Sequence, residues 1–270
     1  MASFAANTAT LLATGVIMAL VNSRYNILRS FSVTFIGLFL LMNAATPTVT
    51  ARFTGGSLMA LTAMTGMWLM YSVYNSPKRG SRHIFLVFML LSAGALTQYG
   101  FLVYIPVFLA GIGQMRAMKA RTLTAAALGI ITPVWLWWAM WPDGFPAFRI
   151  PELDNPFGTL TTIDRIHFFA TIGVTLFTGL ILGSINLMKI YSYNAKARAL
   201  NGLLTVIGVI TGLAALADWS NMPFYVPLLN MCVAFQTGHF FHISMKYRWG
   251  YLTILSLTAI YAGLWVWSMI

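Results

Sequence analysis

The chain has 270 residues, of which 59% are hydrophobic and only 8% are charged, with a mean hydropathy of +0.78. A water-soluble domain carries about 25% charged residues, so this composition excludes a soluble protein and indicates an integral membrane protein. The net charge of +11 comes from scattered Lys and Arg residues without a long basic run, so no nucleic-acid partner is expected. The single cysteine, Cys232, excludes an intrachain disulfide.

Apolar stretches separated by short polar loops predict an all-α polytopic membrane protein with about ten membrane segments. Most of the stretches are as long as a membrane-spanning helix, and only the fourth and fifth are short. In chain order the predicted segments are 4–22, 31–49, 56–74, 84–97, 101–115, 123–142, 164–188, 199–217, 222–243 and 251–269.

The fourth and fifth segments come from one uncharged run, Phe85 to Met115, which is too long for a single crossing. As one helix it would rise roughly 46 Å, against a hydrocarbon core about 30 Å thick. Basic residues flank the run on both sides and favour the cytoplasm, so both of its ends should lie there. We therefore expect a short helical hairpin that turns at Gln98-Tyr99-Gly100, with its tip buried among other helices.

The basic residues also predict the topology. With the loop from Asn22 to Ser30 in the cytoplasm, most of the 16 Lys and Arg residues fall in inside loops, and the outside loops hold Arg52, Arg149 and Arg165. All five acidic residues then fall outside as well. This arrangement predicts that both the N-terminus and the C-terminus lie outside.

A single transmembrane domain is expected over residues 1–270, with one long connection at 142–164. This connection contains Pro142, Pro146, Pro151 and Pro156, which prevent a continuous helix. Its many prolines and aromatic residues favour a loop that lies flat on the outer membrane face.

Two residues at the start of the seventh segment are the candidate catalytic pair. Asp164 and His167 lie directly after the long connection, and a carboxylate beside an imidazole can act as a general base. The alternative is that Asp164 only caps the helix that it opens, because acidic residues are favourable at a helix N-terminus.

Charged residues on the other outer loops are the candidate substrate-binding set. A guanidinium group makes paired hydrogen bonds to phosphate, and the acidic groups would line the same cavity. The set consists of Arg52, Arg149, Arg165, Glu152, Asp154 and Asp218. Asp218 has an alternative role as an interface residue beside Trp219 and Tyr225, which are typical membrane-interface anchors.

His239 and His242 lie three residues apart on one helical face, where two imidazoles could share a metal ion. No carboxylate or thiol accompanies them in the sequence, so two histidines near the lipid headgroups are the simpler interpretation. We expect no metal site and no cofactor. The polar residues within the apolar segments, such as Asn43, Asn186 and Gln236, are expected to hydrogen-bond between helices.

The stretch LSAGALTQYGFLVYIPVFLAGIGQM combines a short helix, a polar-aromatic tip and a return through a proline, and a basic loop and a Trp-rich span follow it. This order of features, over residues 56–142, resembles the middle of the C-fold membrane glycosyltransferases, which use polyprenyl-phosphate sugar donors. It is also similar to small multi-spanning envelope proteins of Bacteroidetes-type bacteria. The resemblance implies a lipid-linked substrate that is handled at the outer face.

The first outer loop departs from the glycosyltransferase pattern. C-fold enzymes carry an essential acidic residue there, whereas AATPTVTARFTGGS in this chain contains no acid. The family's catalytic residues therefore have no match here. Either the site lies in the region from Asp143 to Asp164, or the chain is a non-catalytic relative.

These features predict a bacterial inner-membrane protein of envelope biogenesis, with two alternative functions of different kinds. The first is an enzyme-like protein that handles a lipid-linked or phosphate-bearing substrate at the outer face. The second is a non-catalytic accessory subunit that binds a partner membrane protein. A transporter is less favoured, because no internal repeat and no charge at mid-membrane depth is found in the sequence.

Overall fold

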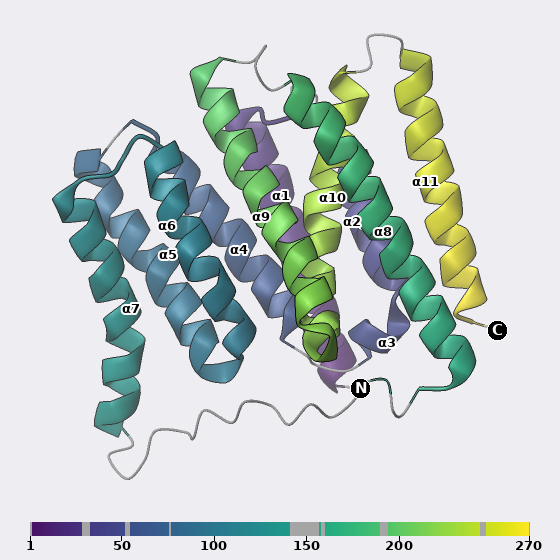
Figure 1. The fold of residues 1–270 in the computed structure, drawn as a ribbon, viewed down its shortest axis with the longest axis horizontal. Coiled ribbons are helices and arrows are strands. Elements are labelled where there is room, and N and C mark those ends of the chain that lie inside the picture. The colour runs from purple at the N-terminus through teal and green to yellow at the C-terminus, as the bar shows by residue number, and fades with distance from the viewer. Residues whose placement is uncertain are drawn as a thin grey trace. The chain divides into compact units, whose positions relative to one another are not determined.

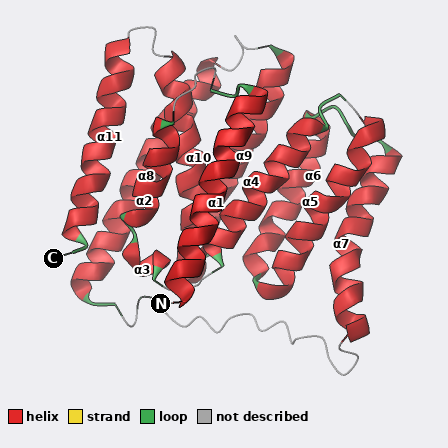
Figure 2. Cartoon of the chain, turned by 180° about the vertical axis from the view of Figure 1, so that it is seen from behind, coloured by secondary structure: helices red, strands yellow, loops and turns green. Residues whose placement is uncertain are grey.

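The structure is a computed structural model, and it describes residues 2–28, 33–51, 55–75, 77–140, 157, 160–189, 194–243 and 247–269. The side chains at 77–79, 242–243 and 247–248 lie outside this description. Within the described ranges all regular secondary structure is helical (Figure 2). The predicted all-α class is therefore confirmed.

The helices follow the predicted apolar segments in chain order (Figure 1). The second segment is divided in two, because Pro47 follows the non-helical residue Thr46 and begins a new turn. The bounds are α1 (Ala2–Tyr25), α2 (Thr34–Ala44), α3 (Pro47–Thr50), α4 (Gly56–Ser72), α5 (Pro77–Thr97), η1 (Tyr99–Val103), α6 (Tyr104–Gln114), α7 (Ala120–Met140), α8 (Thr162–Lys189), α9 (Ala195–Ala217), η3 (Trp219–Asn221), α10 (Met222–Ile243) and α11 (Tyr247–Trp267).

Six helices among the described residues are long and apolar enough to cross a membrane, namely α1, α5, α7, α8, α9 and α11. They make the chain a multi-pass membrane protein. The predicted count of about ten spans is not supported. The helices α2 and α6 have 11 residues each and rise only about 16 Å, and α4 has 17 residues. The 22 residues of α10 are enough for a crossing, but polar residues and prolines lower its hydropathy.

The chain divides into two compact units, which are described separately. Unit 1 contains residues 1–61 and 156–270, and unit 2 contains residues 62–155. The boundary falls within α4. The expectation of a single domain over 1–270 stays a prediction.

Unit 1 is built around α10, which packs against α2, α8, α9 and α11. Almost every side chain of α10 is buried from Phe224 to His239. A helix that carries apolar residues on all sides is stable in lipid or enclosed by other helices, and α10 is enclosed. The outer faces of α8, α9 and α11 carry many exposed large apolar residues instead, as expected for surfaces in contact with lipid.

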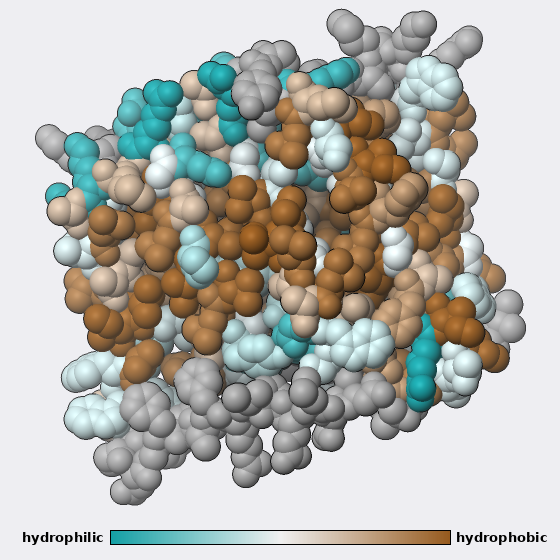
Figure 3. Space-filling model, in the orientation of Figure 1, coloured by the Kyte–Doolittle hydropathy of each residue, from teal (hydrophilic) through white to brown (hydrophobic). Residues whose placement is uncertain are grey.

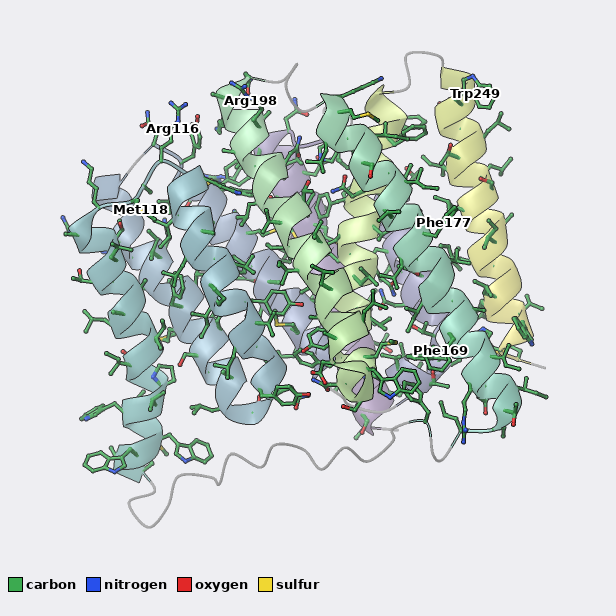
Figure 4. All side chains as sticks on the ribbon, viewed as in Figure 1. Arg116, Met118, Phe169, Phe177, Arg198 and Trp249 are labelled. Carbon is green, nitrogen blue, oxygen red and sulfur yellow. The ribbon has the colours of Figure 1, made fainter. Side chains whose placement is uncertain are left out.

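The two ends of unit 1 differ in charge. One end, here called the basic end, carries Arg24, Lys189, Lys196 and Arg198 at the termini of α1, α8 and α9. The other, here called the acidic end, carries Asp164 and Asp218, and both chain termini lie there (Figure 1). Figure 4 places Arg198 at the basic end of α9 and Phe169 toward the acidic end of α8. Which end faces the cytoplasm stays a prediction.

Unit 2 contains the predicted helical hairpin. The chain leaves α5 at Thr97, is extended at Gln98, and returns through η1 and α6, so the turn at Gln98 is confirmed. Phe101 is buried and its ring packs so closely on Gly94 that a Cβ atom there would lie 2.4 Å from the ring. The helix α5 begins at Pro77, earlier than the predicted residue 84.

The closest helix pair of unit 2 is α5 and α7. A Cβ atom on Gly129 of α7 would lie 2.5 Å from the main-chain oxygen of Phe85 on α5, so only glycine fits there. Nearby, the Ser92 hydroxyl donates to the main-chain oxygen of Ile130 over 2.7 Å. Small residues let membrane helices approach closely, and this contact follows that rule.

Candidate functional site

The structure describes only part of the predicted outer-face site. Asp164, Arg165, His167 and Asp218 lie at the acidic end of unit 1. The other predicted members lie outside the described residues, namely Arg52, Arg149, Glu152 and Asp154. The predicted convergence of all these groups on one cavity is therefore untested.

Asp164 serves the N-terminus of α8. The Thr161 hydroxyl accepts the main-chain N–H of Asp164 at 3.1 Å and donates to the Asp164 carboxylate at 2.7 Å. Thr161 directly precedes the helix, so these bonds satisfy a main-chain donor of its first turn. The capping group is therefore the Thr161 hydroxyl, and the Asp164 carboxylate accepts a hydrogen bond from that hydroxyl.

Arg165 holds the segment that enters α8. Its Nε atom donates to the main-chain oxygen of Leu160 at 3.2 Å, and its main-chain N–H donates to the oxygen of Thr161. The side chain is half-buried. The Nε–H group of Arg165 thus helps to order the chain next to the helix N-terminus.

His167 joins α8 to α11. The side chain is buried, its Nε2 atom lies 2.8 Å from the main-chain oxygen of Leu264, and its ring meets Trp267 edge-on with centroids 5.2 Å apart. A carbonyl oxygen only accepts, so Nε2 must carry the proton in this contact. The nitrogen that faces α11 is consequently a donor, and the general-base role of His167 stays a prediction.

Asp218 connects the end of α9 to α10. Its carboxylate accepts the Tyr225 hydroxyl at 3.0 Å and the Ser220 hydroxyl at 3.4 Å. It follows the last residue of α9 and precedes η3, so it fixes a tight connection between two helices. These hydrogen bonds of Asp164, His167 and Asp218 therefore lead to three different parts of unit 1.

An aromatic cluster at the acidic end was not predicted as a unit. Phe157, Phe168, Phe169 and Trp219 have ring centroids between 5.1 and 5.5 Å apart, and Phe169 and Trp219 are stacked at 6°. Phe157 is buried, although it belongs to the connection expected to lie flat on the membrane. The cluster fixes the start of α8 against the end of α9.

The buried polar residues of unit 1 join helices, as predicted. Asn186 on α8 donates to Gln236 on α10, and Gln236 donates to the Thr205 hydroxyl on α9 at 3.4 Å. Asn230 on α10 donates to Asn43 on α2 at 3.3 Å. All of these groups are neutral. They bridge helices that would otherwise leave polar groups in hydrocarbon.

His239 is buried in α10, and the side chain of His242 lies outside the described residues. Within the part of the chain that the structure describes, no three His, Cys, Asp or Glu side chains gather as they would around a metal ion. The role of the two histidines stays open.

A further feature that the sequence reasoning missed is a groove between α8 and α9. It has a volume of about 250 Å³, and its floor is formed by Cys232, Val233 and Gln236 of α10. Its walls carry two glycine pairs, Gly179 with Gly183 and Gly208 with Gly212. The signal was present as GLILG and GVITG, since glycines four residues apart share one helix face.

No protein-family model, no curated protein and no solved structure matches this chain. The class that the fold defines is an all-helical, multi-pass membrane protein. The resemblance to C-fold glycosyltransferases stays a prediction.

Proposed function

We propose that this chain is a non-catalytic accessory subunit of a bacterial inner-membrane assembly in envelope biogenesis. The observation that carries the proposal is that the candidate residues described by the structure form hydrogen bonds at helix ends and between helices. The Asp164 carboxylate accepts the hydroxyl of Thr161, which caps α8, and His167 donates to the main chain of α11. Asp218 holds the connection between α9 and α10. Groups used in this way stabilise helix ends and helix contacts.

The polar interior supports the same proposal. The bonds from Asn186 to Gln236 and from Asn230 to Asn43 join neutral groups, and each such bond stabilises a membrane helix pair by about 0.6 kcal/mol. Proton relays and ion pathways use ionisable groups at this depth. A framework of neutral amides suits a protein whose task is to hold helices in place.

The proposed topology has about ten membrane segments, with the short helices inserted between the long ones and with both termini outside. Its support is the separation of charge in unit 1. Lys189, Lys196 and Arg198 gather at the basic end, and basic residues favour the cytoplasm. The acidic end, with Asp164 and Asp218, would then face outward.

The rival function is an enzyme with a glycosyltransferase-like scaffold that handles a lipid-linked or phosphate-bearing substrate at the outer face. It requires Arg52, Arg149, Glu152 and Asp154, which lie outside the described residues, to act together with Asp164 and Arg165. The enzyme needs the Asp164 carboxylate for its reaction, whereas the accessory subunit needs it only to stabilise the start of α8.

The test compares three variants in the native host. Asp164→Ala removes the carboxylate, and Thr161→Val removes the capping hydroxyl while leaving the carboxylate in place. Arg52→Gln removes a proposed phosphate ligand. An accessory subunit should keep the host phenotype in all three and should co-purify with a second membrane protein in mild detergent. Loss of function in Asp164→Ala and Arg52→Gln, with normal accumulation and with Thr161→Val unaffected, would establish the enzyme instead.

A further inference from the structure

We infer that the groove between α8 and α9 binds one hydrocarbon chain of an anionic phospholipid, with its phosphate at the basic end of unit 1. The inference is independent of the accessory role proposed above. It rests on the lining of the groove, its size, its exposure and the charges beyond its end.

The lining is almost wholly apolar. Leucines, Val209 and Val233, the four glycines and Cys232 form most of it, and the polar members are Thr205 and Gln236. These two are bonded to each other, and Gln236 also accepts from Asn186. An apolar cavity of about 150 Å³ stays dry and takes up an apolar ligand, so this groove should exclude water as well.

The groove opens on the surface that meets lipid. Leu180 of α8 is 70% exposed and Leu213 of α9 is 57% exposed, and both belong to its rim. Both helices are candidate membrane spans. In Figure 3, brown hydrophobic residues cover the middle of the face that α8 and α9 present. A lipid chain can therefore enter the groove sideways without passing through water.

Size decides between a lipid chain and a partner helix. The lining residues of α9 run from Thr205 to Leu216, which is about 16 Å along the helix. A helix is about 10 Å across, which is too wide to lie within a groove that offers about 250 Å³ over that length, whereas a single hydrocarbon chain is thin enough.

Charge beyond the groove identifies the headgroup. Toward the basic end the groove reaches Gly183 of α8 and Thr205 of α9. Lys189 and Arg198 lie about 10 Å further along these two helices. Both are exposed, as is Lys196, and Figure 4 shows Arg198 at the end of α9. A phosphate at this level would meet Arg198, which lies on the groove side of α9, and the nearby Lys189, and each cation strengthens binding to an anionic lipid about fivefold. The Lys196 ammonium instead lies over the Tyr25 ring, 5.7 Å from its centroid.

Two glycines of α8 give a matched pair of variants. A Cβ atom meets nothing within 4 Å at either Gly183 or Gly173, so a leucine fits at both positions. Gly183 lines the groove and Gly173 does not. Gly183→Leu should fill the groove, and Gly173→Leu should leave it open. Both exchanges raise helix propensity equally, so they should not differ in their effect on the fold.

The experiment uses the full chain in nanodiscs with phosphatidylglycerol that carries a photoreactive group on one acyl chain. We expect crosslinks in α8, α9 and α10 near the groove. The crosslink yield should fall roughly tenfold in Gly183→Leu, because about two methylene groups of the lipid chain lose their contacts. The yield should stay unchanged in Gly173→Leu. The same probe with a phosphatidylcholine headgroup should crosslink less, and the double variant K189Q/R198Q should remove that difference.

A second measurement needs no variant, because Cys232 is the one cysteine of the chain and lines the groove. In detergent, added phosphatidylglycerol should slow the alkylation of Cys232 by an apolar maleimide, and phosphatidylcholine should slow it less. Equal crosslinking in the two glycine variants would overturn the proposed site, as would unprotected Cys232. Equal behaviour of the two lipids would overturn the proposed headgroup, and a protein crosslinked at the groove in place of lipid would overturn the occupant.

Discussion

His167 on α8 is hydrogen-bonded to the main-chain oxygen of Leu264 on α11, with Nε2 lying 2.8 Å from that oxygen. The contact joins residues almost a hundred positions apart in the sequence. The sequence indicated His167 as a base beside Asp164, and the structure shows that it bridges two helices. A nitrogen that donates to a carbonyl holds two helices together.

Replacing His167 should therefore weaken unit 1. His167→Phe keeps the ring against Trp267 but loses the hydrogen bond, so the free energy of unfolding should fall by about 1 kcal/mol. Unfolding of the purified protein in mixed detergent micelles measures this loss. Thr253→Ala on the exposed side of α11 is the control and should change stability by less than about 0.5 kcal/mol. An unchanged unfolding curve for His167→Phe would contradict the bridging role.

Thr161 and Asp164 should act as one capping unit. Thr161→Ala should cost about 1 kcal/mol of stability, which is typical for a lost helix cap, and Asp164→Ala should cost less, because the main-chain N–H of residue 164 keeps its bond to Thr161. The double variant should cost little more than Thr161→Ala alone, because that variant already removes both bonds of the pair. Additive losses would mean that Asp164 has a partner other than Thr161.

Asn186 and Gln236 should be coupled across α8 and α10. In a double-mutant cycle with Asn186→Ala and Gln236→Ala, we expect a coupling energy of about 0.6 to 1.7 kcal/mol, the range for hydrogen bonds between membrane helices. The pair Asn43→Ala and Gln236→Ala is the control, since Asn43 bonds to Asn230. A coupling of zero for the first pair would rule out this bond.

Gly129 should tolerate no side chain. In Gly129→Ala the new Cβ would lie 2.5 Å from the Phe85 oxygen, so α5 and α7 must separate, at a cost of about 1 to 3 kcal/mol. Gly113→Ala is the matched control, because its Cβ would meet Met118 at an ordinary 3.6 Å. Thermal unfolding of the two variants checks this, and equal stability would show that the two helices can move apart without cost.

The proposed topology predicts which residues are reachable from outside the cell. In a Cys232→Ala background, Thr161→Cys at the acidic end should react with a membrane-impermeant maleimide in intact cells. Asn194→Cys at the start of α9 should react only after the membrane is opened. Both positions are exposed in the structure. The opposite pattern would reverse the orientation and move the proposed outer face to the cytoplasm.

Several features of the fold were predictable because they depend on residues that are close in sequence. Apolar stretches predicted the helices in order, and Gln98 with Gly100 marked the turn of the hairpin. The polar residues inside the segments were correctly expected to bond between helices, because an unpaired amide in hydrocarbon is costly.

The candidate site was less predictable, and the described residues support six spans where about ten were predicted. Asp164 and His167 lie on one turn of α8, yet the first bonds to Thr161 and the second to Leu264. The spacing of Asp164 and His167 in the sequence does not show that their side chains bond to different segments of the chain. The second segment was predicted to span, but its helix α2 has 11 residues and rises only about 16 Å.

By itself the sequence determined a helical membrane protein whose basic and acidic residues separate along the helices. Burial of apolar surface and exclusion of charge from lipid act on each segment independently, so composition and order suffice for both. Only the tertiary structure decided that α10 is enclosed, that His167 meets α11, and that four glycines line one groove. These features depend on how each helix is rotated and how far it stands from its neighbours, which is fixed by packing among residues distant in sequence.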